Sequence, residues 1–77
     1  MKITVYGPGC NKCKQAEEVV RSTVAEAGAD VEVEKVSEIR EIVKAGVLTT
    51  PAVAVDGVVK LAGRVPTPDE VKAWLTG

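Results

Sequence analysis

The stretch that decides the fold runs from residue 2 to residue 14 and reads Lys2-Ile3-Thr4-Val5-Tyr6-Gly7-Pro8-Gly9-Cys10-Asn11-Lys12-Cys13-Lys14. Its first five residues alternate between polar and apolar β-formers, which predicts a strand. Gly7-Pro8-Gly9 ends this strand, because proline has no N–H for a central ladder. Apolar residues then recur every three or four positions, which predicts an amphipathic helix from Cys10 to near Gly28. These positions are Cys13, Ala16, Val20, Val24 and Ala27.

The middle of the chain predicts a second strand followed by a short helix. Residues 30–36 alternate again between valine and charged side chains, as in a half-buried strand. Ser37 is expected to cap a helix that runs through Ala45 and is ended by Gly46. The predicted apolar face of this helix consists of Ile39, Ile42 and Val43.

The last third of the chain predicts a hairpin and a capped helix. Two strands, 51–55 and 58–62, flank Asp56-Gly57, a strong hairpin turn signal. Thr67, Pro68 and Glu70 then provide an N-cap, a first helical residue and the second half of a capping box. The inner face of this helix is expected to consist of Val71, Trp74 and Leu75.

This element order, βαβαββα, predicts an α/β fold with a mixed four-stranded sheet and helices on both faces. The first strand–helix–strand unit should be parallel and the hairpin antiparallel. The chain has 77 residues, which we interpret as a single domain over 1–77.

Charge and hydropathy exclude several classes of partner. The chain has ten basic and eleven acidic residues, so its charge is nearly balanced and we expect no basic surface for nucleic acid. The longest apolar run is only a few residues, so we expect no membrane span. The N-terminus enters the first strand directly, without the apolar region of a signal peptide, which favours the cytoplasm.

The two cysteines, Cys10 and Cys13, are the strongest sign of function. The chain has no third cysteine and no histidine. A disulfide between them would close too small a loop to stabilise the fold much, so a structural bridge is a poor explanation. In a reducing compartment such a pair is more often catalytic or metal-binding.

The position of Cys10 at a helix N-terminus favours a reactive thiol. Free N–H groups and the helix dipole there stabilise a thiolate, so its pKa should fall below that of a free thiol. Lys12 adds positive charge, although an exposed lysine acts weakly through water. Cys13 lies one turn on and is more shielded. We therefore expect Cys10 to attack a substrate disulfide as the nucleophile and Cys13 to resolve the mixed disulfide.

Two other interpretations of the pair stay open. Half of a zinc site would need ligands from a second chain, since zinc takes four and this chain offers two. The cysteines could also be inert and buried.

The segment Tyr6–Lys14, together with Thr49-Thr50-Pro51 before the third strand, resembles the small thioredoxin/glutaredoxin-like proteins of archaea and anaerobic bacteria, also called redox-active disulfide proteins. The resemblance covers essentially the whole chain. It implies a thioredoxin-like fold and a cis Thr50–Pro51 bond, with the backbone of Thr50 facing the two sulfurs and holding an extended substrate. Tyr6, which ends the first strand beside the motif, is a candidate for shaping the same groove, and the alternative is a half-buried packing residue.

The resemblance also implies partners. They are disulfide-containing protein substrates and a separate, thioredoxin-reductase-like electron donor. No cofactor is expected beyond the Cys10–Cys13 disulfide itself, no metal site is expected, and we expect a monomer.

Three departures from better-known relatives stand out. The thioredoxin signature Trp-Cys-Gly-Pro-Cys is replaced by Gly-Cys-Asn-Lys-Cys, and the first strand carries no carboxylate. Proton transfer to Cys13 would therefore involve water, Lys12 or another group. The glutathione-binding elements of glutaredoxins are missing around Ala62-Gly63-Arg64.

The alternative function is a CxxC metal-binding module or carrier, of the copper or mercury type. Such ferredoxin-like carriers are equally short and also place a CxxC after their first strand. They usually have a methionine ahead of the first cysteine, where this chain has Pro8-Gly9, and their βαββαβ order ends in a strand. A third possibility, an adaptor domain, would need no reactive Cys10.

Overall fold

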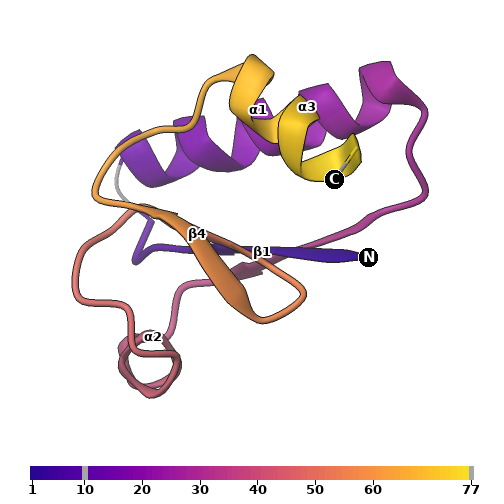
Figure 1. Cartoon of the computed structure of the whole chain (residues 1–77). Coiled ribbons are helices and arrows are strands. Elements are labelled where there is room, and N and C mark those ends of the chain that lie inside the picture. The colour runs from indigo at the N-terminus through magenta and orange to yellow at the C-terminus, as the bar shows by residue number, and fades with distance from the viewer. Residues whose placement is uncertain (10, 77) are drawn as a thin grey trace.

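Four strands and three helices make up the described part of the chain, residues 1–9 and 11–76, in the computed structural model (Figure 1). The elements are β1 (Lys2–Tyr6), α1 (Asn11–Ala27), β2 (Glu32–Val36), α2 (Ile39–Lys44), β3 (Ala52–Val55), β4 (Val58–Ala62) and α3 (Pro68–Thr76). Their order is the predicted βαβαββα, and the boundaries fall within one or two residues of the predicted ones.

The sheet has the strand order β2-β1-β3-β4. β1 pairs in parallel with β2, with Ile3 opposite Val33, and α1 forms the crossover between them. On its other side β1 pairs antiparallel with β3, with Tyr6 opposite Ala52. β3 and β4 form the antiparallel hairpin. The mixed four-stranded sheet expected from the sequence is therefore confirmed.

Helices cover both faces of the sheet, again as predicted. α1 and α3 lie on one face and α2 lies on the other (Figure 1). The main core forms between the sheet and the helices α1 and α3, almost entirely from β-branched and small side chains. Its buried members are Ile3, Val5, Ala16, Val20, Val24, Val53, Val55 and Val71. Of the expected inner face of α3, Val71 is fully buried, whereas Trp74 and Leu75 are partly buried against this core.

The apolar face of α1 differs from the prediction at one position. Cys13, Ala16, Val20 and Val24 are buried as expected, but Ala27 is exposed. Ala27 is the last residue of the helix. Thr23 is buried in the same helix, with 1% of its surface exposed. A threonine was not recognised as a core residue because periodicity counts only apolar side chains.

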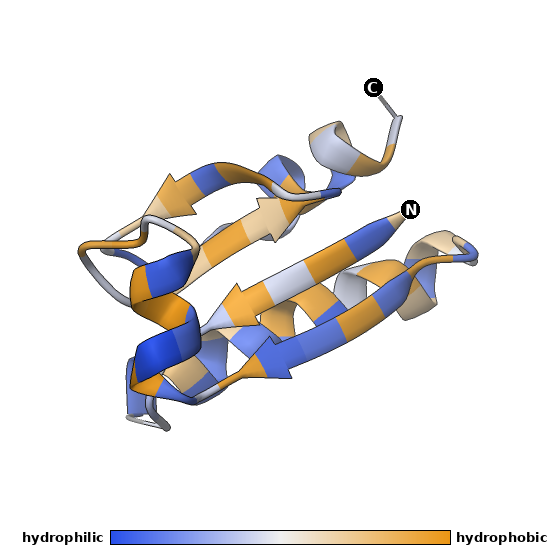
Figure 2. Cartoon of the chain, turned by 90° about the horizontal axis from the view of Figure 1, so that it is seen from below, coloured by the Kyte–Doolittle hydropathy of each residue, from blue (hydrophilic) through white to orange (hydrophobic). Residues whose placement is uncertain are grey.

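The short helix α2 differs more. Its N-cap is Glu38, with no side-chain cap hydrogen bond, so the prediction that Ser37 caps it is wrong. Only Ile42 is buried, whereas Ile39 and Val43 are each 67% exposed. A helix of six residues lies across only one end of the sheet and leaves the rest of that face uncovered (Figure 2), so it directs a single apolar side chain inward. Ile42 packs there with Val47 and Ala52.

The capping box of α3 forms as predicted. The Thr67 N–H donates to Glu70 Oε1 over 3.0 Å, and the Glu70 N–H donates back to Thr67 Oγ1 over 3.3 Å. Arg64 also donates to both carboxylate oxygens of Glu70, at 2.8 and 2.6 Å. These hydrogen bonds, led by that of Arg64, lower the pKa of Glu70 from 4.5 to about 2.

We predict a pH-dependent contribution of Glu70 to stability. A carboxylate whose pKa falls on folding stabilises the protein fully above its ordinary pKa, and this contribution is lost as the pH falls toward the lowered value. Glu70→Gln should therefore lower the free energy of unfolding at neutral pH, and its difference from the wild type should shrink between about pH 5 and about pH 2. Urea unfolding followed by the fluorescence of Trp74, the only tryptophan, measures this.

The matched control is Asp69→Asn, which removes a carboxylate from the same helical turn. Among the ion pairs of the described residues, Asp69 takes part in none, so its substitution should not reproduce the narrowing difference. A Glu70→Gln deficit that stays constant from pH 7 to pH 2 would contradict the assigned role.

Candidate functional site

Cys13 lies in the first turn of α1, as its third residue, and none of its surface is exposed. Its burial fits a shielded cysteine, and its shielding relative to Cys10 stays a prediction. Cys10 lies outside the described residues, so its predicted place at the helix N-terminus stays a prediction. In the sequence it directly precedes Asn11, the first residue of α1.

The end of β1 packs directly on Cys13. Gly7 follows the last residue of β1 and is buried, and its N–H donates to the carbonyl of Val36 over 2.9 Å. A Cβ atom placed on Gly7 would lie 2.7 Å from Cys13 Cβ and even closer to Cys13 Sγ. The backbone of residue 7 and the side chain of Cys13 are therefore in immediate contact.

Pro51 lies at the same end of the sheet, in the loop before β3. Ala52, the next residue, pairs with Tyr6, and Tyr6 immediately precedes Gly7. The Thr50–Pro51 peptide bond is cis, as the family resemblance implies. Pro51 is buried and Thr50 is half-buried, so Thr50 is the more accessible of the two.

Gly63, the residue after β4, completes this end of the sheet. Its N–H donates to the carbonyl of Pro51 over 2.9 Å, and its φ is +89°. A Cβ atom on Gly63 would lie 3.3 Å from Thr49 Oγ1. A glycine at this position indicates a bend or a close backbone approach, but the sequence did not identify Pro51 as the partner. The signal in the sequence was the position of Gly63 directly after β4, because β4 pairs with β3 and Pro51 directly precedes β3.

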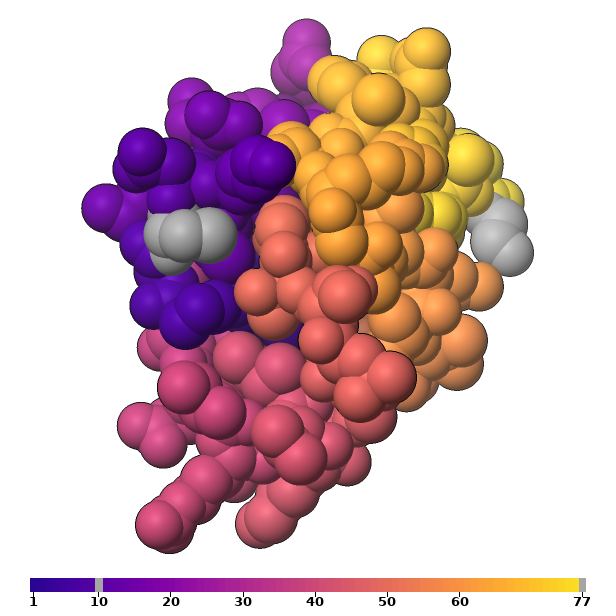
Figure 3. Space-filling model, turned by 90° about the vertical axis from the view of Figure 1, so that its left-hand side faces the viewer, coloured from indigo at the N-terminus to yellow at the C-terminus, as the bar shows by residue number. Residues whose placement is uncertain are grey.

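Three segments thus meet on one face of the molecule (Figure 3). They are the end of β1 with the start of α1 in indigo, residues 47–51 in salmon, and the start of the loop after β4 in orange. The hydrogen bond of Gly7 fixes the first segment to Val36 of β2, and the hydrogen bond of Gly63 joins the third segment to Pro51 in the second. The arrangement brings Gly7, Cys13, Pro51 and Gly63 to one end of the sheet.

The remaining predicted site residues lie around this end. Tyr6 is half-buried and packs on the α2 side of the sheet, against the cluster of Ile42, Val47 and Ala52. Cys13 lies on the other side, with α1. Lys12 is exposed on the first turn of α1 and forms none of the ion pairs found among residues 1–9 and 11–76. Their roles in substrate binding and electrostatics stay predictions.

No carboxylate is buried within the described part of the chain, where the buried polar side chains are Thr4 and Thr23. The absence of an acid from β1, noted in the sequence, is therefore not offset by a buried acid from another described element. Within the same residues, no cluster of three or more histidine, cysteine, aspartate or glutamate side chains is arranged to hold a metal ion.

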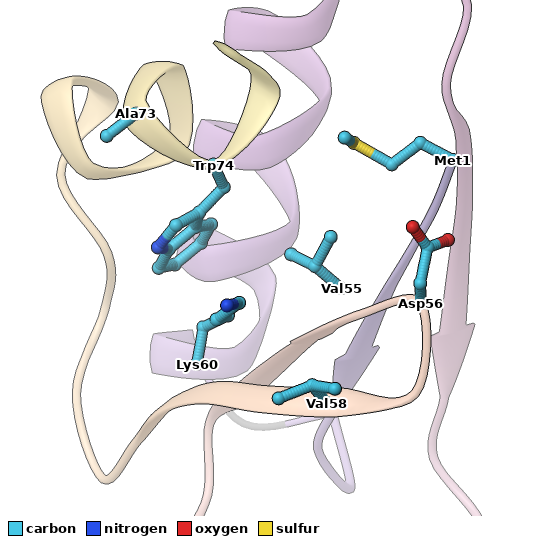
Figure 4. Close-up of a pocket in the computed structure, with 7 residues that line it drawn as sticks. All are labelled: Met1, Val55, Asp56, Val58, Lys60, Ala73 and Trp74. Carbon is cyan, nitrogen blue, oxygen red and sulfur yellow. The ribbon is translucent and has the colours of Figure 1, made fainter. Parts of the chain in front are cut away.

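A pocket of about 410 Å³ lies at the opposite end of the sheet, between α3 and the β3–β4 hairpin (Figure 4). The indole of Trp74 and the side chain of Lys60 lie next to each other there, across the pocket from Met1 and Asp56. Neither Gly7, Cys13 nor Pro51 lines this pocket. It is therefore separate from the candidate redox site.

None of the described helices combines the length and the apolar character needed to cross a lipid bilayer.

Comparison with known proteins agrees with this architecture. A family model described as a thioredoxin domain matches residues 1–76. A protein named thioredoxin from Methanothermobacter thermautotrophicus is 43% identical over 76 residues, which cover 99% of each chain. Another thioredoxin, from Methanocaldococcus jannaschii, is 41% identical over 73 residues, which cover 95% of this chain and 84% of that protein. With its fold, its cis-proline loop and matches of this extent, the chain belongs to the thioredoxin family.

Proposed function

We propose that this member of the thioredoxin family reduces protein disulfides through a dithiol–disulfide cycle of Cys10 and Cys13. The observation that carries the proposal is the family match, which spans residues 1–76 and so includes both cysteines. Membership of this family makes the chain a disulfide oxidoreductase that depends on a separate reductase. The assignment of roles to the two cysteines is the finer part of the proposal.

The first half of the cycle is an attack by Cys10. Its thiolate forms a new bond to one sulfur of the substrate disulfide, and the other substrate sulfur leaves as a thiolate. The burial of Cys13 supports this order, because a fully buried thiol cannot meet a protein substrate first. The product is a mixed disulfide between Cys10 and the substrate.

The second half is resolution by Cys13. Cys13 gives up its proton and attacks the Cys10 sulfur, which forms the Cys10–Cys13 disulfide and releases the second substrate thiol. With no buried carboxylate among the described residues, we propose that water takes up this proton. The reductase then returns two electrons and two protons to the pair.

The substrate segment is proposed to bind along Thr50 and Pro51, with Tyr6 as a further contact. Pro51 already accepts a hydrogen bond from Gly63, which holds the loop after β4 against it. This contact supports a groove whose walls are backbone rather than long side chains. Such a groove suits the main chain of an extended protein segment.

A cytoplasmic location fits this proposal, because a reducing compartment keeps such a dithiol in the working form. The partners are then disulfide-containing proteins and the electron donor, with no bound cofactor. The observed βαβαββα order gives no support to the ferredoxin-like metal carrier, whose chain ends in a strand.

We predict opposite outcomes for the two cysteine variants. Cys10→Ser should reduce insulin disulfides no faster than the buffer alone, because no nucleophile remains to start the cycle. Cys13→Ser should attack once and stop, so the mixed disulfide at Cys10 should accumulate and be visible by mass spectrometry of the intact adduct. Sustained turnover by Cys10→Ser would overturn the mechanism.

A second prediction concerns the loop after β4. Gly63→Ala places a side chain at positive φ and 3.3 Å from Thr49 Oγ1, so the loop should move away from Pro51. KM for a protein disulfide should rise, by about tenfold if about 1.4 kcal/mol of binding is lost, with kcat little changed.

The control is Gly28→Ala, which also places a side chain at positive φ, at +62°, but whose added carbon meets no group other than its chain neighbours within 4 Å. It lies beyond the opposite end of α1 from the cysteines. An equal rise of KM in both variants would mean that general destabilisation, rather than the groove, is responsible.

A further inference from the structure

We propose that Gly7 is the positioning residue for Cys13, and that the absence of a side chain at residue 7 places this thiol for the resolving step. This inference rests on the proposed function and deepens it. It assigns to Gly7 a positioning role that is not evident from its place in the sequence or from the family match.

The conformation of Gly7 does not explain why a glycine is needed. Gly9, Gly28, Gly46, Gly57 and Gly63 all have positive φ, in the region that L-residues avoid. Gly7 does not, so an alanine could adopt its backbone conformation. What excludes a side chain at residue 7 is therefore the space that Cys13 occupies.

Neither partner of this contact can retreat easily. Gly7 continues β1, a central strand paired on both sides, and its N–H is bonded to Val36. Cys13 belongs to α1, whose buried residues Ala16 and Val20 pack in the main core beside β1. The separation between residue 7 and residue 13 is thus set by the packing of α1 on the sheet.

A rotation of the Cys13 side chain cannot relieve the contact. A Cβ at residue 7 would approach Cys13 Sγ, which could turn away, but it would also lie 2.7 Å from Cys13 Cβ. The position of Cβ is fixed by the helix backbone. Because carbon atoms pack at about 3.5–4.0 Å, the first turn of α1 and the end of β1 would have to separate by on the order of 1 Å.

Such a shift should slow resolution by Cys13 more than the initial attack by Cys10. Resolution requires the Cys13 sulfur to reach the Cys10 sulfur within the narrow geometry of a disulfide. A displacement of about 1 Å can slow such an intramolecular step by up to about 100-fold. The initial attack uses the Cys10 sulfur and the substrate and does not use Cys13.

The test is Gly7→Ala in the full chain, with the two steps timed separately against a disulfide-containing protein such as insulin. Rapid acid quenching and mass spectrometry give the rates at which the mixed disulfide forms and disappears. We expect resolution to slow by at least tenfold and the mixed disulfide to accumulate, with attack little changed. Gly28→Ala, the strained control described above, should leave both rates at the wild-type values.

Two outcomes would overturn the inference. One is wild-type resolution by folded Gly7→Ala. The other is an equal slowing of attack and resolution, which would indicate a structural role alone. If the wild-type chain itself does not reduce the disulfides of insulin, the proposed function fails, and the contact is then tested by stability.

That stability test is a double-mutant cycle with Cys13→Gly, which removes the Cβ that an alanine at residue 7 would meet. The cost of Gly7→Ala to the free energy of unfolding should fall sharply in the Cys13→Gly background. The same design applies if Gly7→Ala alone fails to fold, because the double variant should then recover a folded state. An equal cost, or failure to fold, in both backgrounds would refute the contact.

Discussion

The pairing of β1 with two neighbours is the constraint on which the rest of the structure depends. β1 lies inside the sheet, parallel to β2 and antiparallel to β3, and its inward side chains Ile3 and Val5 are fully buried. The parallel pair requires a long crossover, which α1 provides, and the antiparallel pair brings the start of β3 beside the end of β1. The cysteine-bearing helix and the cis-proline loop meet at one end of the sheet because both adjoin this strand.

The two ends of the sheet differ in the groups that line them. At the candidate redox site the contacts involve glycine backbone, a buried cysteine and a proline carbonyl. At the other end, the pocket between α3 and the hairpin is lined by longer side chains, including Met1, Lys60 and Trp74. A site with backbone walls supports recognition of the main chain, which proteins of any sequence share. This is consistent with the proposed binding of an extended protein segment along Thr50 and Pro51.

Most of the fold follows from local signals in the sequence. The capping box of α3 was predictable because Thr67 and Glu70 are three residues apart and bond to each other. The β3–β4 hairpin was predictable from Asp56-Gly57, because these two adjacent residues form the turn between the strands. Predictions of burial failed for helix residues whose burial depends on whether another element packs against them. α2 is too short to bury Ile39 and Val43, and Ala27 is exposed at the last position of α1.

The site was predicted in part. The burial of Cys13 and the cis Thr50–Pro51 bond agree with expectation, the second through the family resemblance alone. The contacts of Gly63 with Pro51 and of Gly7 with Cys13 were not foreseen. Pro51 and Gly63 are far apart in the chain and meet only through the register of β3 and β4. Gly7 and Cys13 are six residues apart, but their contact depends on how closely α1 packs on the sheet.

Cys10 and Cys13 are proposed to form a reversible redox couple rather than a metal site. Equilibration of the chain against a thiol redox buffer, with Cu(I) and Zn(II) binding measured in parallel, tests this proposal most directly. We expect a two-electron dithiol–disulfide couple with a potential in the range of cytosolic reductants, and no tight metal binding. Stoichiometric, tight metal binding without reversible disulfide formation would contradict the proposal.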